Sequence, residues 1–175
     1  ICITLTPLIA ISIFLDNGRP IFYSQTRSGK GGQLYEIIKF RTMRRDAEAD
    51  GQARWASEDD QRATRVGRIL RKTHLDELPQ FFNVLRGEMS LVGPRAERPE
   101  LAENFEREIP FYRARLLVKP GITGWAQINF GYASNVEETI IKLEYDLYYI
   151  KHRNLLMDII ILLRTPGTVF GLKGR

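Results

Sequence analysis

Apolar residues dominate the first fifteen positions of the chain, which carry no charge. This run is shorter than the roughly 20 apolar residues that a helix needs to cross a bilayer. Pro7 also interrupts it, and a proline inside a helix removes a backbone hydrogen bond and bends the helix axis. The pattern alone predicts either a buried core helix or one end of a spanning helix.

Two runs rich in β-branched and aromatic residues come next, at positions 20–25 and 34–40. The glycine-rich segment 28–32 between them predicts the turn of a β-hairpin. Its Gly-Lys pair lacks the earlier glycine and the following Ser or Thr of a phosphate-binding P-loop, so we interpret it as a turn. Residues 44–62 are polar, with Trp55 as the one large apolar residue, and indicate a surface loop that closes over a substrate.

Helical periodicity appears in three later segments. Apolar residues recur three and four positions apart between 65 and 85, which predicts amphipathic helices that end at Gly87. Further helices are predicted at 136–150 and at 155–163, and the second is almost wholly apolar. Tyrosines near these apolar ends suit either a membrane interface or a buried site with a hydrogen-bonded hydroxyl. They are Tyr145, Tyr148 and Tyr149.

Positive charge is concentrated in two parts of the sequence. The 175 residues carry a formal net charge of +5; residues 16–45 contain seven Lys or Arg against two acids, and residues 61–75 contain five against none. This predicts anionic partners, and phosphorylated small molecules, nucleic acid and anionic lipid all satisfy it. The single cysteine, Cys2, excludes an internal disulfide framework and a Cys-based zinc site, and favours a reducing, cytosolic setting.

Two adjacent acids, Asp76 and Glu77, lie at a predicted helix start. Thr73 with Asp76 fits a capping box, whereas Pro79 in a first helical turn would make Asp76 itself the cap. Either arrangement places Asp76 near the positive end of a helix dipole, which would keep its carboxylate ionised. Two roles stay open from these residues alone, because capping acids and a nucleophile with its partner have the same local pattern.

Five ordered motifs carry a specific resemblance. The run from Leu70 to Leu85 is joined by Lys-Phe-Arg-Thr-Met at 39–43, Thr-Arg-Val-Gly-Arg at 64–68, Met-Ser-Leu-Val-Gly-Pro-Arg at 89–95 and Lys-Pro-Gly-Ile-Thr-Gly-Trp-Ala-Gln at 119–127. With these motifs the chain resembles the bacterial sugar transferase family, the monotopic polyprenyl-phosphate phosphoglycosyl transferases. The likeness extends from Pro7 to Tyr149.

The resemblance implies a helix-dominated α+β fold with a small β-hairpin. Residues 1–15 would be the truncated end of a re-entrant membrane helix that enters one leaflet, bends at Pro7 and returns to the same face. Residues 16–175 would form the catalytic domain on the cytosolic face of the bacterial inner membrane. The implied partners are a UDP-sugar, polyprenyl phosphate and one leaflet of the membrane, without nucleic acid, and homo-oligomer formation stays open.

The resemblance also implies a two-step reaction that initiates exopolysaccharide or other glycoconjugate assembly. Asp76 would attack the β-phosphate of the UDP-sugar, release uridine monophosphate and hold the hexose phosphate covalently until polyprenyl phosphate takes it. Glu77 would help to hold Mg²⁺. A carboxylate can form an acyl phosphate, and a divalent metal with cationic side chains neutralises phosphoryl charge. Family positions that handle phosphate or nucleotide match Lys39, Arg71 and Arg95.

Two departures from the family pattern concern the substrate site. His74 stands where a serine is usual, and the residues from Asn129 to Tyr132 replace the usual Asn-Gly-Arg. The second departure removes a basic residue that is often near substrate, and Arg113 or Arg115 are candidates to replace it.

Two other functions compete with this assignment. A basic nucleic-acid-binding module fits the charge, but the chain lacks the clustered aromatic residues of base-stacking surfaces and any recognised DNA-binding helix motif. An inactive membrane scaffold with the same fold is disfavoured by the intact Asp76 and Glu77 pair.

Overall fold

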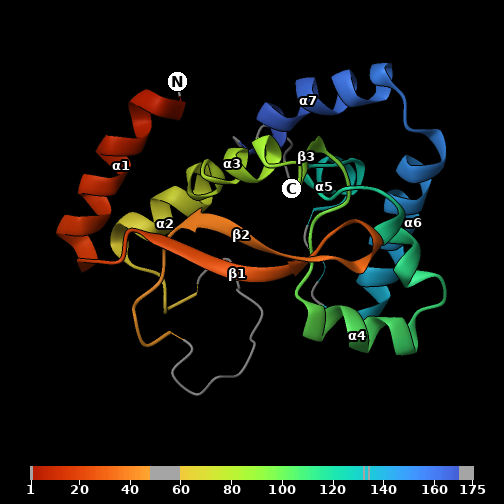
Figure 1. Ribbon diagram of the computed structural model, residues 1–175, viewed down its shortest axis with the longest axis horizontal. Coiled ribbons are helices and arrows are strands. Elements are labelled where there is room, and N and C mark those ends of the chain that lie inside the picture. The colour runs from red at the N-terminus through yellow and green to blue at the C-terminus, as the bar shows by residue number, and fades with distance from the viewer. Residues whose placement is uncertain (1, 48–59, 132, 134, 170–175) are drawn as a thin grey trace. The chain divides into compact units, whose positions relative to one another are not determined.

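The computed structural model describes residues 2–47, 60–131, 133 and 135–169 (Figure 1). The chain divides into two compact units: the first contains Ile1–Ser24 and Ile38–Pro79, and the second contains Gln25–Ile37 and Gln80–Arg175. Helices predominate in the described residues, with two small sheets of two strands each, which confirms the predicted α+β class. Residues 48–59 of the predicted surface loop lie outside the described residues.

The N-terminal apolar run forms helix α1 (Cys2–Asn17), which continues through Pro7. Ile9 and Ile13, one helical turn apart, are buried against Phe40 and Leu70 in the core of the first unit. Other apolar side chains of α1 are exposed, with Leu8 at 63% and Leu15 at 78%. Among the described residues no helix has both the length and the apolar character needed to cross a bilayer. The predicted helix is confirmed, and its re-entrant path stays a prediction.

Two polar side chains, those of Arg41 and Asp16, form hydrogen bonds that hold the end of α1 to the rest of the first unit. The buried guanidinium of Arg41 donates hydrogen bonds to the backbone carbonyls of Asn17, Gly18 and Arg19 at 2.7–3.2 Å. The carboxylate of Asp16 accepts a hydrogen bond from the backbone N–H of Val66 at 3.0 Å. The end of α1 is therefore held at the beginning of the next helix, α2 (Arg65–Lys72).

Helix α2 lies directly on the backbone of the Lys-Phe-Arg-Thr-Met motif. Its N-cap is Thr64, whose hydroxyl accepts a hydrogen bond from the N–H of Gly67 at 2.9 Å. A Cβ atom at Gly67 would overlap the carbonyl oxygen of Thr42. Glycine is therefore required at this position because two backbones approach closely, not because its own dihedral angles are unusual.

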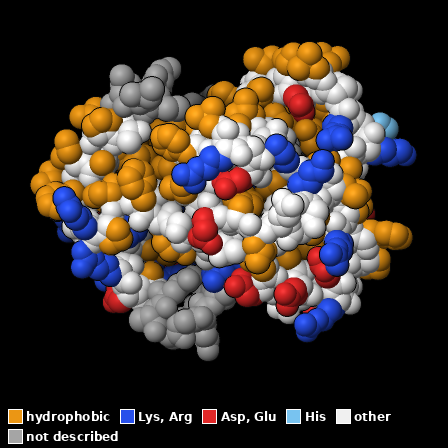
Figure 2. Space-filling model, viewed as in Figure 1, with side chains coloured by type: hydrophobic (Ala, Val, Ile, Leu, Met, Phe, Trp, Pro, Cys, Tyr) orange, Lys and Arg blue, Asp and Glu red, His pale blue; other side chains and the backbone are white. Residues whose placement is uncertain are grey.

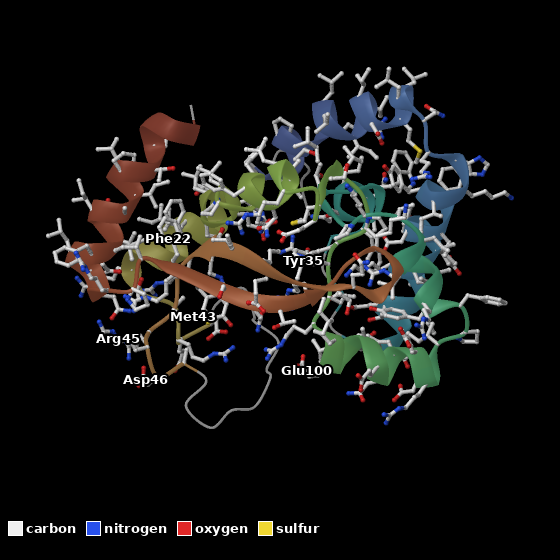
Figure 3. All side chains as sticks on the ribbon, viewed as in Figure 1. Phe22, Tyr35, Met43, Arg45, Asp46 and Glu100 are labelled. Atoms are coloured by element: carbon white, nitrogen blue, oxygen red, sulfur yellow. The ribbon has the colours of Figure 1, made fainter. Side chains whose placement is uncertain are left out.

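The predicted hairpin is present as β1 (Phe22–Ser28) and β2 (Leu34–Phe40), joined by the short 3₁₀ helix η1 (Lys30–Gly32). The interpretation of 28–32 as a turn is confirmed by the positive φ angles of Gly31 and Gly32, 69° and 82°. In the first unit, Phe22, which is labelled in Figure 3, stacks on Phe40. Their ring centroids are 5.3 Å apart.

In the second unit, two of the sequence motifs form one parallel strand pair. Strand β3 (Ser90–Val92) pairs with β4 (Gly121–Thr123), with Ser90 opposite Gly121 and Val92 opposite Thr123. A Cβ atom at Gly121 would overlap the backbone N of Gly93. The glycines of both motifs therefore permit the close approach of two backbones just beyond β3.

Three hydrophobic clusters pack the helices of the second unit. The helices are α3 (Gln80–Leu85), α4 (Pro99–Glu108), the 3₁₀ helix η3 (Tyr112–Leu117), α5 (Trp125–Asn129), α6 (Val136–His152) and α7 (Leu155–Val169). Helices α6 and α7 confirm the predictions at 136–150 and 155–163, and α7 continues further.

Tyr149 is buried, with its hydroxyl 2.8 Å from Asp158, whereas Tyr148 is 51% exposed. Tyr149 therefore fits the buried alternative, whereas a membrane interface at Tyr148 stays a prediction.

One face of α7 is apolar and exposed. Figure 2 shows hydrophobic side chains gathered along this helix. Leu155, Leu156 and Leu163 are 77%, 67% and 76% exposed. Met157 and Ile161, on the opposite face, are buried in the core of the second unit. An apolar face in contact with water is unfavourable, so it needs a partner.

Candidate active site

A tight turn between α2 and α3 carries the two candidate catalytic acids. Helix α2 ends at Thr73, whose hydroxyl donates back to the carbonyl oxygen of Ile69 at 2.8 Å. His74 then adopts a left-handed conformation with φ 53°, and Asp76 and Glu77 belong to the 3₁₀ helix η2 (Leu75–Glu77). A non-glycine residue in this region is uncommon and carries some backbone strain.

The predicted helix caps at this turn are wrong. Thr73 caps the end of α2 instead of the start of a new helix, so it forms no capping box with Asp76. Helix α3 begins only at Gln80, which leaves Asp76 four residues before it. The reason is the left-handed His74, which breaks the helix after Thr73 and gives the acids a 3₁₀ turn of their own. The dipole of a helix that starts at Asp76 therefore cannot be what keeps its carboxylate ionised, as the sequence had suggested.

Both acids are buried within the first unit, Asp76 at 8% and Glu77 at 7% exposure. A buried carboxylate needs compensating partners, because its transfer out of water is costly. Lys39, near the end of β2, supplies one: its Nζ lies 2.7 Å from Oε1 of Glu77. The structure therefore brings together two of the predicted site residues that are 38 positions apart in sequence.

Arg71 lies in the last turn of α2, in the same unit, and is partly buried. The guanidinium of Arg62 holds the pKa of Asp60 below its usual value. The positive charge of Arg71 lowers the same pKa by a smaller amount. A cation close to the Asp76 turn in sequence is consistent with the predicted phosphate contact of Arg71, which stays a prediction.

The carboxylates suit a magnesium ion that is shared with a phosphate substrate. Mg²⁺ in phosphoryl-transfer sites is held by one or two carboxylates together with substrate oxygens, not by a dedicated protein cage. The adjacent Asp76 and Glu77 supply two carboxylates in one turn. Among the described residues there is no group of three or more side chains that would hold a metal by themselves. Two adjacent carboxylates fit the ligand chemistry of Mg²⁺, and its binding here stays a prediction.

Arg95 belongs to the second unit, directly after the β3 segment. The backbone before it is fixed by hydrogen bonds from Gly93 N–H to the Thr123 carbonyl and from Gly121 N–H to the Pro94 carbonyl, both 2.9 Å. Arg95 itself forms a bridge with Gly121. These contacts agree with the expectation that this motif fixes the backbone of Arg95. Its contact with a phosphate stays a prediction.

Arg115 was a candidate to replace the missing basic residue, and the structure disfavours that role. The residue is 7% exposed, and its guanidinium is bound by the protein. Nε lies 2.7 Å from Oδ2 of Asp146, and Nη1 donates to the hydroxyl of Tyr112 at 2.8 Å. Arg113, two residues earlier, is exposed and remains a candidate.

This arginine belongs to an ionic cluster of four residues, three of them buried, which sequence reasoning missed. Its members are Arg115, Asp146, Glu97 and Lys142, and Lys142 Nζ lies 2.7 Å from Glu97 Oε1. Burial alone would raise the pKa of Glu97, but Lys142 and Arg115 outweigh burial and lower this pKa from 4.5 to about 2. The only sequence signal was the placement of Lys142 and Asp146 on the buried side of the predicted helix at 136–150, one turn apart.

Comparison with known proteins adds an independent observation. A family model described as bacterial sugar transferase matches residues 1–172. A UDP-N-acetylgalactosamine-undecaprenyl-phosphate N-acetylgalactosaminephosphotransferase of Aeromonas hydrophila is 48% identical over 160 residues, which are 91% of this chain and 38% of that protein. A UDP-glucose:undecaprenyl-phosphate glucose-1-phosphate transferase of Xanthomonas campestris pv. campestris is 42% identical over 168 residues, 94% of this chain and 34% of that protein.

A shorter relative, the uncharacterized sugar transferase EpsL of Bacillus subtilis strain 168, is 38% identical over 174 residues. The match covers 99% of this chain and 82% of that protein. By contrast, the chain spans about a third of the length of the Aeromonas and Xanthomonas relatives.

Proposed function

Because the chain belongs to the bacterial sugar transferase family, we propose that it moves a hexose 1-phosphate from a UDP-sugar to undecaprenyl phosphate. The printed names of the relatives support this donor and acceptor class, and they include both glucose and N-acetylgalactosamine. The observation that carries the proposal is the buried Asp76 and Glu77 turn, with Lys39 bound to Glu77. It joins an acid pair to a cation, as phosphoryl transfer requires.

In the proposed first step, a carboxylate oxygen of Asp76 attacks the β-phosphorus of the donor. A new bond forms between this oxygen and the phosphorus, and the bond from the phosphorus to the bridging oxygen breaks. Uridine monophosphate leaves with that bridging oxygen and its electron pair. The sugar phosphate is then an acyl phosphate on Asp76.

In the second step, a phosphate oxygen of undecaprenyl phosphate attacks the same phosphorus. The bond to Asp76 breaks, and the carboxylate is regenerated together with undecaprenyl diphosphate sugar. Lys39 and Arg71 would bind phosphoryl oxygens, and Arg95 would bind the donor. Mg²⁺, held by Glu77 with Asp76, would supply positive charge to the phosphoryl oxygens when bound.

The proposal includes attachment to one leaflet of the bacterial inner membrane, on its cytosolic face. The exposed apolar side chains of α1 and of α7 support it, because both helices present apolar surface that water disfavours. The basic residues 16–45 would add attraction to anionic headgroups. The product would start the assembly of an exopolysaccharide or another glycoconjugate.

A panel of donors tests the proposal. The full-length protein in nanodiscs is mixed with undecaprenyl phosphate, Mg²⁺ and one UDP-sugar at a time, and uridine monophosphate release is measured. We expect release with one or a few UDP-hexoses and transfer of the labelled sugar to the lipid. Failure with every UDP-sugar, together with salt-sensitive retention on DNA, would favour the nucleic-acid-binding alternative instead.

A further inference from the structure

The guanidinium of Arg115 joins three segments of the second unit. Besides its contacts with Asp146 on α6 and Tyr112 on η3, its Nη2 donates a hydrogen bond to the backbone carbonyl of Arg95 at 2.8 Å. We propose that Arg115 is a positioning residue that holds the backbone of Arg95, so that the Arg95 side chain meets the donor phosphate. This inference rests on the proposed function, in which Arg95 binds the donor.

The geometry needs an arginine and not merely a positive charge. A guanidinium has five N–H donors in a planar fork, which can reach three acceptors in fixed directions at once. Here the three acceptors are a carboxylate, a hydroxyl and a backbone carbonyl. A lysine could keep the ion pair with Asp146 but could not also span the distance to the carbonyl of Arg95.

The backbone around Arg95 is held from several sides. On one side, the hydrogen bonds of Gly93 and Gly121 fix the backbone just before it. On the other side, the Glu97 carboxylate pairs with Lys142, and the Glu97 carbonyl accepts a hydrogen bond from Ser28 N–H at 3.1 Å. Arg115 supplies the contact to the Arg95 carbonyl between them.

A small displacement of this carbonyl would be costly for donor binding. A side chain that binds phosphate through a rigid fork depends on the position of its own backbone. A misplacement of about 1 Å in a positioned group can cost about 100-fold in catalysis. We therefore expect loss of the Arg115 contact to act on the donor and not on the lipid acceptor.

The first test is Arg115→Lys in the full-length protein in nanodiscs. The KM for the UDP-sugar should rise by about 10- to 100-fold, without a matching change in the KM for undecaprenyl phosphate. Two controls separate positioning from stability. Tyr112→Phe removes one hydrogen bond of the same guanidinium but leaves its contact with the Arg95 carbonyl, so it should lower the melting temperature and raise the donor KM much less than Arg115→Lys does. Arg107→Lys, at an exposed position of α4, should change neither quantity.

A double-mutant cycle with Arg95→Lys decides whether Arg115 acts through Arg95. If it does, the double variant should have a donor KM close to that of the more affected single variant, because both changes disable the same contact. Multiplication of the two single effects would overturn the inference, and so would a lower melting temperature with an unchanged donor KM. If Arg115→Lys does not fold, Asp146→Asn replaces it in the cycle, since it removes the negative charge of the ion pair and so weakens the hold on Nε.

The two proposals fail in different ways. Absence of uridine monophosphate release by the unmodified protein would contradict the proposed function. An active enzyme in which Arg115→Lys raises the donor KM while Arg95→Lys does not would contradict the positioning role, since Arg115 would then act by another route.

Discussion

Each unit holds a group of ionisable side chains that are largely buried, and the two groups differ in how their acids are arranged. In the first unit, the acidic turn carries two adjacent buried carboxylates, and Lys39 binds Glu77 at 2.7 Å. In the second unit, two acids and two cations form a cluster around Arg115, which also binds a hydroxyl and a backbone carbonyl. The first arrangement places two acids side by side in one turn, as the proposed chemistry requires, whereas the second joins segments that are far apart in sequence and contacts the backbone of Arg95.

The largest expected effect is that of Asp76→Asn, which tests the active role of the first arrangement. An amide cannot attack phosphorus, so transfer should fall by at least about 1,000-fold. The amide has nearly the same shape as the carboxylate, so the melting temperature should change little. Activity near that of the unmodified enzyme would remove Asp76 from the mechanism. Glu100→Gln, at an exposed acid on α4 (Figure 3), is the control and should be neutral.

Glu77→Gln should have the next largest effect and separates the two functions of this side chain. The glutamine oxygen can still accept a hydrogen bond from Lys39, but a neutral amide is a poor ligand for Mg²⁺. We expect the Mg²⁺ concentration for half-maximal activity to rise at least about tenfold, and turnover to fall with it. An unchanged Mg²⁺ titration would reassign Glu77 to a structural pair with Lys39.

Gly67→Ala tests whether close packing of α2 supports the first unit. Alanine favours a helix over glycine by about 1 kcal/mol. The added Cβ atom would nevertheless overlap the carbonyl oxygen of Thr42, so α2 must move away from it. We expect a net loss of about 1–3 kcal/mol in the free energy of unfolding, measured by denaturant titration. Arg68→Ala, at an exposed position of the same helix, should not be destabilising to this extent. Stabilisation by Gly67→Ala would contradict the close approach.

The smallest expected effect is a dependence of stability on pH in the second unit. The pKa of Glu97 is lowered to about 2, because Lys142 and Arg115 outweigh burial, whereas its unfolded value is about 4.5. The ionised Glu97 therefore stabilises the folded chain above pH 4.5, and this contribution is lost as pH falls from about 5 toward 2. The difference in melting temperature between the unmodified protein and Glu97→Gln should shrink over this range. A constant difference would exclude the ion pairs as its cause.

Periodic segments were predicted well because local pattern determines them. Helices α6 and α7 and the hairpin follow directly from apolar spacing and glycine-rich turns. Strands β3 and β4 have three residues each, too few for a pattern, and exist because they pair with each other. Helix α4 was missed although Pro99 stands in its first turn, a favourable helix start.

The motifs singled out candidate site residues that local rules could not. Among them are Lys39 and Glu77, and the structure adds a contact between them that the sequence did not predict, while their catalytic roles stay predictions. Local rules failed at Thr73, because nothing in the sequence indicated that His74 would adopt a left-handed conformation. The pair of Arg115 and Asp146 spans 31 positions and forms only when η3 packs against α6, so no local rule predicts it.

The most direct test of the account is to trap the sugar phosphate on Asp76. The full-length protein is mixed with its UDP-sugar and Mg²⁺ in the absence of undecaprenyl phosphate, quenched, digested and analysed by mass spectrometry. We predict a burst of about one equivalent of uridine monophosphate per active site, with the added mass of a hexose phosphate on the peptide that contains Asp76. Later addition of undecaprenyl phosphate should remove this mass. Release of uridine monophosphate only when the lipid is present, with no modified peptide, would contradict the covalent mechanism.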